Sequence, residues 1–416
     1  MEYGCIARTL GHSFSRDIHA RIDDYAYTLR EVEPEALGAF LTARDFKGIN
    51  VTIPYKQDVI PYLDHVSETA RTIGAVNTIV NRDGKLLGDN TDFGGMRALL
   101  AHMGLTLKGK KVMILGTGGT SRTARAVASS LGAREIVTVS RKAGNQTVTY
   151  GQALLQHTDA EAILNTTPVG MYPQTDPSPI ALDAFPALEG VMDAVYNPLR
   201  STLVLEAQRR GIRAEGGLYM LVAQAVLAAR LFTGKHYPDE KIDEIYASLC
   251  SEKRNIVLCG MPACGKTTIG KALAESLGRV LVDLDDEIVR ADGRPIPEIF
   301  RQDGEAAFRE VECHVTARFA QENGLVIATG GGCVLRHENV TRLKHNGLIF
   351  FIDRPLTQLL PTADRPTANT AQKIRELYET RMPLYRAAAD VTIPSNGVAQ
   401  RVADAIRRGF FEVNAK

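Results

Sequence analysis

Short apolar runs recur along the chain and alternate with longer stretches in which apolar and charged residues are mixed. Apolar runs that end at glycine or polar positions are typical of buried strands, and the mixed stretches are typical of helices that cover them. The strands predicted in this way are 49–53, 75–80, 111–115, 136–139, 162–164, 190–195, 255–258, 280–282, 325–328 and 348–352. Because strands that alternate with helices favour parallel sheets, the pattern predicts an α/β fold.

The same pattern divides the chain into three blocks. The first covers about residues 1–103, the second opens with the strand at 111–115, and the third opens with the strand at 255–258. The junction at 233–254 has a turn-like start and a charged, helix-like run over 239–249, without a long Gly/Ser-rich or Pro-rich linker. At roughly 100–200 residues per domain, a chain of 416 residues agrees with two to four domains.

Charge and cysteine content narrow the class of protein. A net charge of +1 gives no sign of a nucleic-acid or membrane surface, which would need a concentrated basic field. The six cysteines are scattered without a C-x-x-C pair, which favours a reducing compartment over a disulfide framework or a zinc site. The N-terminus lacks the pattern of a signal peptide, and the apolar stretch 218–232 is too short and too polar to span a bilayer. We therefore expect a cytoplasmic protein without nucleic-acid or membrane partners, and the sequence leaves its oligomeric state open.

The strongest motif is a phosphate-binding loop at residues 260–267, G-M-P-A-C-G-K-T, which follows an apolar strand and precedes a helix-like run. Glycines let the backbone N–H groups surround phosphate oxygens, and the helix N-terminus adds its positive dipole end. The motif assigns Lys266 to the β/γ phosphates and Thr267 to Mg²⁺. A glycine turn without a ligand is the alternative, which the strand–loop–helix context disfavours.

Two carboxylates follow the next predicted strand. Asp283 and Asp285 lie two apart on an extended segment, at the strand end where α/β proteins bind ligands. They predict a metal or substrate site, and the alternative is that they cap the helix that starts near Asp286.

Together with further motifs, these residues make the third block resemble the shikimate kinase family over residues 255–396. The shared motifs are the loop, Asp283-x-Asp285, Phe308-Arg309-x-x-Glu312, Gly330-Gly331-Gly332, Asp364-Arg365-Pro366 and Arg381-x-Pro383-Leu384-Tyr385-Arg386. The resemblance implies that shikimate is held by Asp285, Arg309, Gly330, Gly331, Gly332 and Arg381. Independently, two arginines suit bidentate recognition of a carboxylate, and glycines let the backbone approach the ring.

The resemblance also implies how the kinase works. The implied ATP-binding residues are Gly260, Pro262, Ala263, Cys264, Gly265, Lys266, Thr267, Thr268 and Arg365. Mg²⁺ would be bound by Thr267 and by Asp283, and Asp285 would orient the 3-hydroxyl group and accept its proton. The lid that carries Arg365 is short, and Leu359-Leu360-Pro361 stands where many members have an adenine-stacking arginine, so the sequence leaves nucleotide selectivity open.

The second block contains a variant of the dinucleotide fingerprint, Leu115-Gly116-Thr117-Gly118-Gly119-Thr120-Ser121, after a strand and before a helix. An enzyme that uses NAD usually has an acidic residue at the end of the next strand. Here that strand ends in Ser140-Arg141-Lys142, which suits the 2′-phosphate of NADP. The predicted NADP-binding residues are Gly116, Gly118, Gly119, Thr120, Ser140, Arg141 and Lys142.

Residues 3 to about 235 resemble the shikimate dehydrogenase family. The motifs are Gly11-His-Ser13-Phe-Ser15, Asn50-Val-Thr52-Ile-Pro-Tyr-Lys56, Gly74-Ala-Val-Asn77-Thr, Gly88-Asp-Asn-Thr-Asp92, Asp193-Ala-Val-Tyr196-Asn-Pro and Gly217-Leu-Tyr-Met-Leu-Val-Ala-Gln224. The resemblance implies a catalytic pair, Lys56 and Asp92, and a substrate site formed by Ser13, Ser15, Thr52, Asn77, Asp92, Tyr196 and Gln224. A cationic donor beside the ketone oxygen would lower the barrier to reduction, because negative charge develops there as hydride arrives.

Together these resemblances imply a bifunctional enzyme. Residues 1–250 would form a two-lobed dehydrogenase, with a substrate domain at 1–103, a Rossmann-like NADP domain at 104–216, and helices at 217–250 that return to the first lobe. Residues 251–416 would form a P-loop kinase domain like that of nucleoside-monophosphate kinases. The first part would reduce 3-dehydroshikimate with NADPH, and the second would phosphorylate shikimate with ATP and Mg²⁺. Two alternatives remain: a quinate/shikimate dehydrogenase joined to a kinase for another polyol acid, or one part that binds ligand without catalysis.

Overall fold

The apolar runs form the centres of three sheets. The computed structural model describes the whole chain except residues 11–13, 145, 361–369, 396 and 415–416. It divides into two compact units, Met1–Tyr246 and Ala247–Lys416. Among the residues it describes, no helix is both long and apolar enough to cross a membrane.

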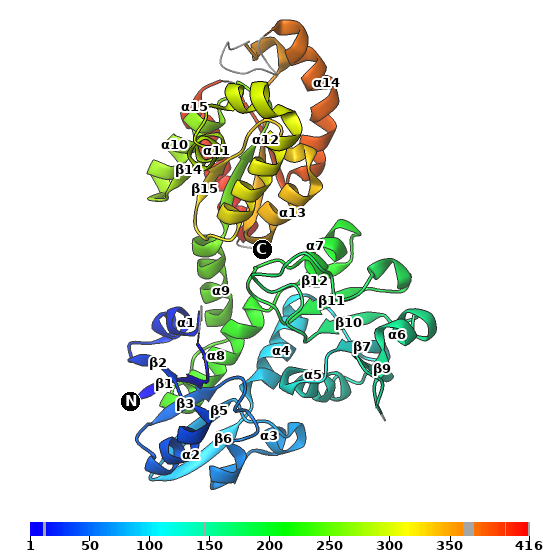
Figure 1. Cartoon of the computed structure of the whole chain (residues 1–416). Coiled ribbons are helices and arrows are strands. Elements are labelled where there is room, and N and C mark those ends of the chain that lie inside the picture. The colour runs from blue at the N-terminus through cyan, green and yellow to red at the C-terminus, as the bar shows by residue number, and fades with distance from the viewer. Residues whose placement is uncertain (11–13, 145, 361–369, 396, 415–416) are drawn as a thin grey trace. The chain divides into compact units, whose positions relative to one another are not determined.

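The first sheet of the first unit has six strands in the order β2-β1-β3-β5-β6-β4 (Figure 1). Its strands are β1 (Tyr3–Ala7), β2 (Tyr27–Glu31), β3 (Gly48–Val51), β4 (His65–Val66), β5 (Thr78–Arg82) and β6 (Lys85–Asp89). Its helices are α1 (Ser15–Ile22), α2 (Pro34–Ala43), the 3₁₀ turn η1 (Ile60–Tyr62), α3 (Glu68–Ile73) and α4 (Thr91–His102).

This sheet differs from the prediction because β5 runs antiparallel to both β3 and β6. The antiparallel pairing of β5 with β6 follows from a two-residue hairpin turn at Asp83-Gly84, where φ is +52° and +81°. Asp-Gly is a favoured sequence for such a turn, because both central residues adopt positive φ. The strand predicted at 49–53 also ends early, at Val51, and Ile53 is 74% exposed.

The second sheet is wholly parallel, in the order β12-β11-β10-β7-β8-β9. Its strands are β7 (Lys111–Leu115), β8 (Glu135–Ser140), β9 (Val148–Thr149), β10 (Ala162–Asn165), β11 (Gly190–Asp193) and β12 (Arg213–Glu215). Its helices are α5 (Gly119–Ser130), α6 (Tyr150–Gln156), the 3₁₀ turn η2 (Leu182–Ala184) and α7 (Thr202–Arg209). The strand predicted at 111–115 is confirmed to the residue.

Two helices follow this sheet, α8 (Leu218–Thr233) and α9 (Glu240–Lys253). Helix α8 packs on α4 and also contacts α1, β3 and β5 of the first sheet. The close packing of α8 on α4 depends on Gly95, where a Cβ would lie 2.7 Å from the carbonyl oxygen of Met220. The boundary between the two units falls within α9.

The second unit has one parallel sheet in the order β14-β15-β13-β16-β17. Its strands are β13 (Asn255–Cys259), β14 (Leu281–Asp283), β15 (Val326–Ala328), β16 (Gly347–Asp353) and β17 (Val391–Pro394). Its helices are α10 (Lys266–Leu277), α11 (Leu284–Asp292), α12 (Ile296–Ala320), α13 (His337–Asn346), α14 (Ala371–Ala388) and α15 (Ala399–Asn414), with 3₁₀ turns η3 (Cys333–Leu335) and η4 (Leu356–Gln358). Helix α12 is kinked at Gly304, where φ is +81°.

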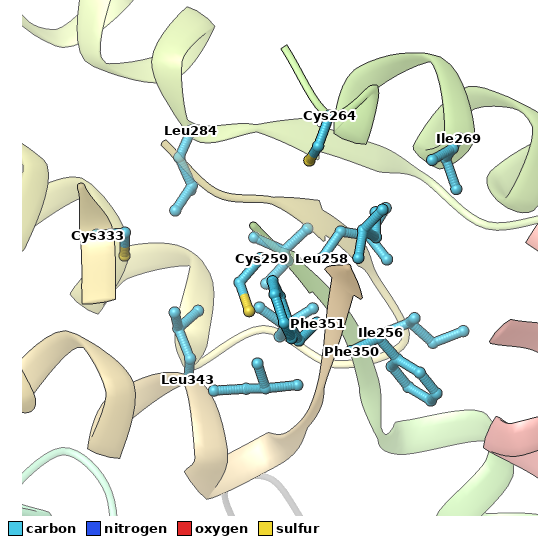
Figure 2. Packing of buried hydrophobic residues seen from close by; sticks show 14 of the residues in the cluster. Ile256, Leu258, Cys259, Cys264, Ile269, Leu284, Cys333, Leu343, Phe350 and Phe351 are labelled. Carbon is cyan, nitrogen blue, oxygen red and sulfur yellow. The ribbon is translucent and has the colours of Figure 1, made fainter. Parts of the chain in front are cut away.

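The core of the second unit lies around its two central strands. Figure 2 shows Leu258 on β13 and Phe350 and Phe351 on β16 among the side chains of this core. Cys264, from the loop before α10, is also buried in it. The core therefore anchors the glycine-rich loop to the centre of the sheet.

Candidate active sites

A buried ion pair marks the first candidate site. Lys56 follows β3, and Asp92 lies in the first turn of α4, whose N-cap is Asn90. Lys56 Nζ donates to Asp92 Oδ2 over 2.6 Å, and both side chains are mostly buried. The two residues are 36 positions apart, and the antiparallel pairing of β3, β5 and β6 brings them together. The lysine therefore has a fixed position and a carboxylate that stabilises its charge.

A network of side-chain amides and hydroxyls lies around this pair. Asn77 Oδ1 accepts from the Thr91 backbone over 2.7 Å, and Asn77 Nδ2 donates to Thr91 Oγ1 over 3.1 Å. Thr91 Oγ1 lies 3.5 Å from Gln224 Oε1 on α8. The structure thus brings Asn77 and Gln224 together through Thr91, a residue that we did not single out although it stands in the motif that ends in Asp92.

The other predicted substrate residues lie on nearby segments. Ser15 begins α1, Thr52 directly follows β3, and Ser13 lies outside the described residues. Tyr196 follows β11, and its ring lies 5.6 Å from that of Phe14. Burial raises the pKa of the Tyr196 hydroxyl. Tyr196 therefore links the loop after β11 to the segment that carries Ser15.

The glycine loop between β7 and α5 lies next to Lys56. Gly116 has a φ of +107°, which favours glycine, and a Cβ there would lie 2.9 Å from Thr166 Oγ1. A Cβ on Gly119 would lie 3.9 Å from Lys56 Cδ, so the loop and the lysine are neighbours. Ser121, at the position of a third glycine, donates to the carbonyl oxygen of Gly116 over 2.7 Å. Gly118 is the N-cap of α5 and Gly119 and Thr120 begin that helix, so its free N–H groups fit a pyrophosphate.

The basic residues predicted to select NADP lie at the end of the neighbouring strand. Ser140 ends β8, and Arg141 and Lys142 follow it with exposed side chains. Because β8 pairs with β7 up to Leu115 and Val139, these cations lie at the sheet edge that carries the glycine loop. Two exposed cations at this edge fit a ribose 2′-phosphate.

The second candidate site contains the phosphate-binding loop of the second unit. Positive φ values at Gly260 and Gly265, +147° and +98°, close the loop between β13 and α10. Ala263 also has a positive φ, +63°, which is strained for a residue with a Cβ. Lys266 Nζ donates to the carbonyl oxygens of Gly260 and Met261, over 2.9 Å and 3.0 Å. The ammonium group is thus held inside the loop, whose remaining predicted contacts are Pro262, Cys264, Thr267 and Thr268.

Asp283 has two roles at this site. It accepts from the Thr267 hydroxyl over 2.6 Å, and it caps α11 by accepting from the Asp285 backbone over 3.1 Å. Asp283 therefore caps α11, which was the alternative interpretation, and also lies beside Thr267, where the sequence predicts a metal site. A hydroxyl and a carboxylate this close are hard oxygen ligands that fit Mg²⁺, which binds proteins through one or two such groups and takes its other ligands from phosphates and water.

A cavity of about 380 Å³ opens beside this loop. Its lining includes Pro262, Thr267, Asp283, Asp285, Arg309, Glu312, Gly330, Gly331, Gly332 and Arg381. The structure thus brings together all the predicted substrate residues of this unit. Arg365, predicted from the lid, lies outside the described residues.

Both arginines of the cavity are fixed by neighbours. Arg309 donates to Glu312 over 2.8 Å and to Glu305 over 2.9 Å, and Arg381 donates to the Gly331 carbonyl oxygen over 3.0 Å. Glu312 is 1% exposed at its side chain, and burial raises its pKa against the opposing effect of Arg309. We assigned Glu312 no role from the sequence, although its spacing of three after Arg309 on a helix places both on one face.

The two folds define the class of protein: a two-lobed reductase with a dinucleotide loop, followed by a P-loop phosphotransferase. Residues 5–79 match the family model of the shikimate dehydrogenase substrate binding domain, and residues 262–409 match that of shikimate kinase. The chain belongs to the shikimate dehydrogenase family, and a shikimate kinase domain follows in the same chain.

Similar proteins support this assignment for the first unit. A shikimate dehydrogenase (NADP(+)) of Geobacillus kaustophilus is 39% identical over 264 residues, which cover 57% of this chain and 94% of the relative. The crystal structure of shikimate dehydrogenase 1 from Peptoclostridium difficile is 32% identical with a TM-score of 0.55, and covers 60% of this chain and 98% of its own. The shikimate 5-dehydrogenase of Thermus thermophilus, solved in complex with NADP(H) and shikimate, is 30% identical with a TM-score of 0.54, and covers 59% and 98%.

Proposed function

We propose that the chain reduces 3-dehydroshikimate to shikimate with NADPH in its first unit and phosphorylates shikimate with ATP in its second. The observation that carries the reductase is the buried Lys56–Asp92 pair beside the glycine loop. The observation that carries the kinase is the cavity that joins Arg309 and Arg381 to the phosphate-binding loop. Each site has the cationic hydrogen-bond donors that its reaction needs.

In the reductase, NADPH bound by the glycine loop and by Arg141 and Lys142 supplies the hydride. Lys56 donates a hydrogen bond to the ketone oxygen and then a proton, because negative charge develops there during reduction. Asp92 holds the ammonium group of Lys56 in place through a hydrogen bond of 2.6 Å. Asn77 and Gln224 bind ring hydroxyls, and Ser13 and Ser15 bind the carboxylate.

In the kinase, catalysis consists mostly of positioning and charge neutralisation. Arg309 and Arg381 bind the substrate carboxylate, and Asp285 orients the 3-hydroxyl group and accepts its proton. Mg²⁺ held by Thr267 and Asp283 would neutralise phosphate charge. Lys266 leaves the loop carbonyls to bind the β/γ phosphates, and Arg365 stabilises the transferred phosphoryl group.

The location and partners of the protein follow from the same reasoning. All six cysteines are buried and the sequence has no C-x-x-C pair, as expected of a reducing compartment, and we propose the cytoplasm. The ligands are small molecules: 3-dehydroshikimate, shikimate, NADP(H) and ATP.

The experiment that tests this proposal supplies 3-dehydroshikimate, NADPH, ATP and Mg²⁺ to the wild type, to Lys56→Ala and to Lys266→Ala. We expect Lys56→Ala to lose NADPH oxidation by a factor of about 10² to 10⁴, the usual contribution of a positioned proton donor, and to keep phosphorylation of added shikimate. We expect Lys266→Ala to keep NADPH oxidation and to lose ADP formation.

Two exposed lysines serve as matched controls, Lys47 in the first unit and Lys271 on α10. Lys47→Ala and Lys271→Ala should retain both activities. Loss of both activities in either active-site variant would contradict independent sites. A panel with quinate and other polyol acids in place of shikimate tests the alternative substrates, and shikimate binding without ADP formation would show a kinase domain that binds without catalysis.

A further inference from the structure

Asp193 is a fully buried carboxylate to which the proposed reaction assigns no role. It is the last residue of β11 and is 0% exposed, as is Asn165, the last residue of the neighbouring strand β10. The two residues stand opposite each other in the sheet. Both therefore lie at the edge of the nucleotide-binding sheet where ligands bind.

Hydrogen bonds to Asp193 join three segments at this edge. Its Oδ1 accepts from Asn165 Nδ2 over 2.8 Å and from the Val195 backbone over 3.0 Å. Its Oδ2 accepts from the Ser201 hydroxyl over 2.5 Å, and Ser201 is the N-cap of α7. The carboxylate thus holds both ends of the loop 194–201.

Each end of this network reaches the reductase site. Asn165 Oδ1 accepts from the backbone and hydroxyl of Thr167, next to Thr166, whose hydroxyl lies against Gly116 of the glycine loop. At the other end, the loop held by Val195 and Ser201 carries Tyr196, whose ring faces Phe14 of the substrate lobe.

We propose that Asp193 is a positioning residue of the reductase: its ionised carboxylate fixes the loop that carries Tyr196 relative to the glycine loop. This inference rests on the proposed reductase function. All three partners of Asp193 donate, so an ionised carboxylate satisfies every one of them. A protonated carboxyl group must turn one oxygen into a donor, which conflicts with one of the three.

The surroundings of Asp193 make this group sensitive to pH. Burial raises the pKa of Asp193 to about 6, although the hydrogen bonds from Ser201, Val195 and Asn165 lower it. No ion pair joins it to a cation within the residues that the structure describes, and Glu215 on the flanking strand β12 accepts from Tyr246. Ionisation of Asp193 therefore depends on these hydrogen bonds.

The test measures kcat and KM of the full-length protein for 3-dehydroshikimate and NADPH between pH 5 and pH 8. For Asp193→Asn we expect at least a tenfold loss of kcat at pH 7.5, unchanged kinase activity, and no further loss at acid pH. The wild type should lose kcat as the pH falls through about 6, because Asp193 then takes up a proton. The matched control is Asp159→Asn, at the opposite edge of the same sheet, which should keep the wild-type profile.

A second variant keeps the test decisive if Asp193→Asn does not fold. Ser201→Ala removes one donor to the carboxylate but leaves its charge, so it should move the acid midpoint of kcat to higher pH. Wild-type kcat and an unchanged acid limb in Asp193→Asn, or an unmoved midpoint in Ser201→Ala, would overturn the proposal. A wild type that does not oxidise NADPH would instead refute the reductase function itself.

Discussion

Gly332 is a glycine for a steric reason, and replacing it tests how the kinase holds its substrate. Its φ is −100°, a value that any residue adopts, so the backbone does not require glycine there. A Cβ at this position would lie 2.6 Å from Cζ of Arg309, well inside the ordinary contact distance of 3.4 Å. Nη1 and Nη2 of Arg309 would lie closer still, so in Gly332→Ala the guanidinium group must move by about 1 Å.

Arg309 cannot make this movement without loss. Its side chain is held by Glu312 and Glu305 and lies over the ring of Phe308. If Arg309 binds the substrate carboxylate as proposed, a displaced guanidinium group would keep at most one of its two hydrogen bonds to that carboxylate. A hydrogen bond to a charged group contributes about 1.5–3 kcal/mol, and every 1.4 kcal/mol is tenfold in affinity. We therefore expect the KM for shikimate to rise between about tenfold and a hundredfold.

The assay measures ADP formation over a range of shikimate and ATP concentrations. The KM for ATP should stay within about twofold of the wild type, because the phosphate-binding loop is unchanged. Gly409→Ala is the matched control, since its Cβ would meet Phe350 at an ordinary 3.5 Å within α15. Arg309→Lys, which keeps the charge but not the planar fork, should also raise the KM. If Gly332→Ala keeps a wild-type KM for shikimate, Arg309 does not hold the carboxylate.

Two stability predictions concern backbone strain and buried charge. Ala263→Gly should stabilise the second unit by about 0.5–1 kcal/mol. The positive φ costs alanine about 1–2 kcal/mol, which glycine avoids, whereas glycine raises the conformational entropy of the unfolded chain and so loses about 0.4–1 kcal/mol of stability. Calorimetry measures the unfolding midpoint of the second unit, which is identified as the transition that added ATP shifts. An unchanged or lower midpoint in Ala263→Gly would contradict the strain argument. For Asp193, the folded-state pKa is raised from 3.8 to about 6, so its contribution to stability is present below pH 3.8 and is lost as the pH rises through about 6. At 1.36 kcal/mol per pH unit, the unfolding free energy of the wild type relative to Asp193→Asn should fall by about 2 kcal/mol between pH 4 and pH 7. Urea titrations at the two pH values measure it, and a difference that does not change with pH would refute the assignment.

The sequence predicted the central strands well because strands buried on both faces are continuous apolar runs. Strands β7, β13 and β16 were found in this way within one residue of their ends. Most edge strands escaped this reasoning because few of their residues are buried, although the edge strand β14 was predicted at 280–282. Strand β17, for example, has one buried residue, Ile393, and ends in a proline, which suits an edge position. The central strand β1 was missed although all of its residues are buried.

The chemical groups of both sites were also predictable, because each stands in a short motif next to a strand end. Their contacts were not predictable, because contacts depend on the order of strands in the sheet. Asp283 and Thr267 are 16 residues apart and meet at 2.6 Å only because β14 and β13 both flank β15. The buried contact of Glu312 with Arg309 was not predicted for a related reason. An acidic residue on a helix is usually exposed, and only the packing around Glu312 shows that it is buried.

The two reactions are connected by chemistry, since the hydroxyl group made in the first is the group phosphorylated in the second. Each site takes its described groups from a single unit, Lys56 and Asp92 in one and Asp283, Arg309 and Arg381 in the other. Either reaction can therefore be removed without changing a ligand contact of the other. Shikimate that reaches the kinase must leave one site and bind at another. The chain therefore gains efficiency from its fusion only if release from the first unit is followed by capture in the second.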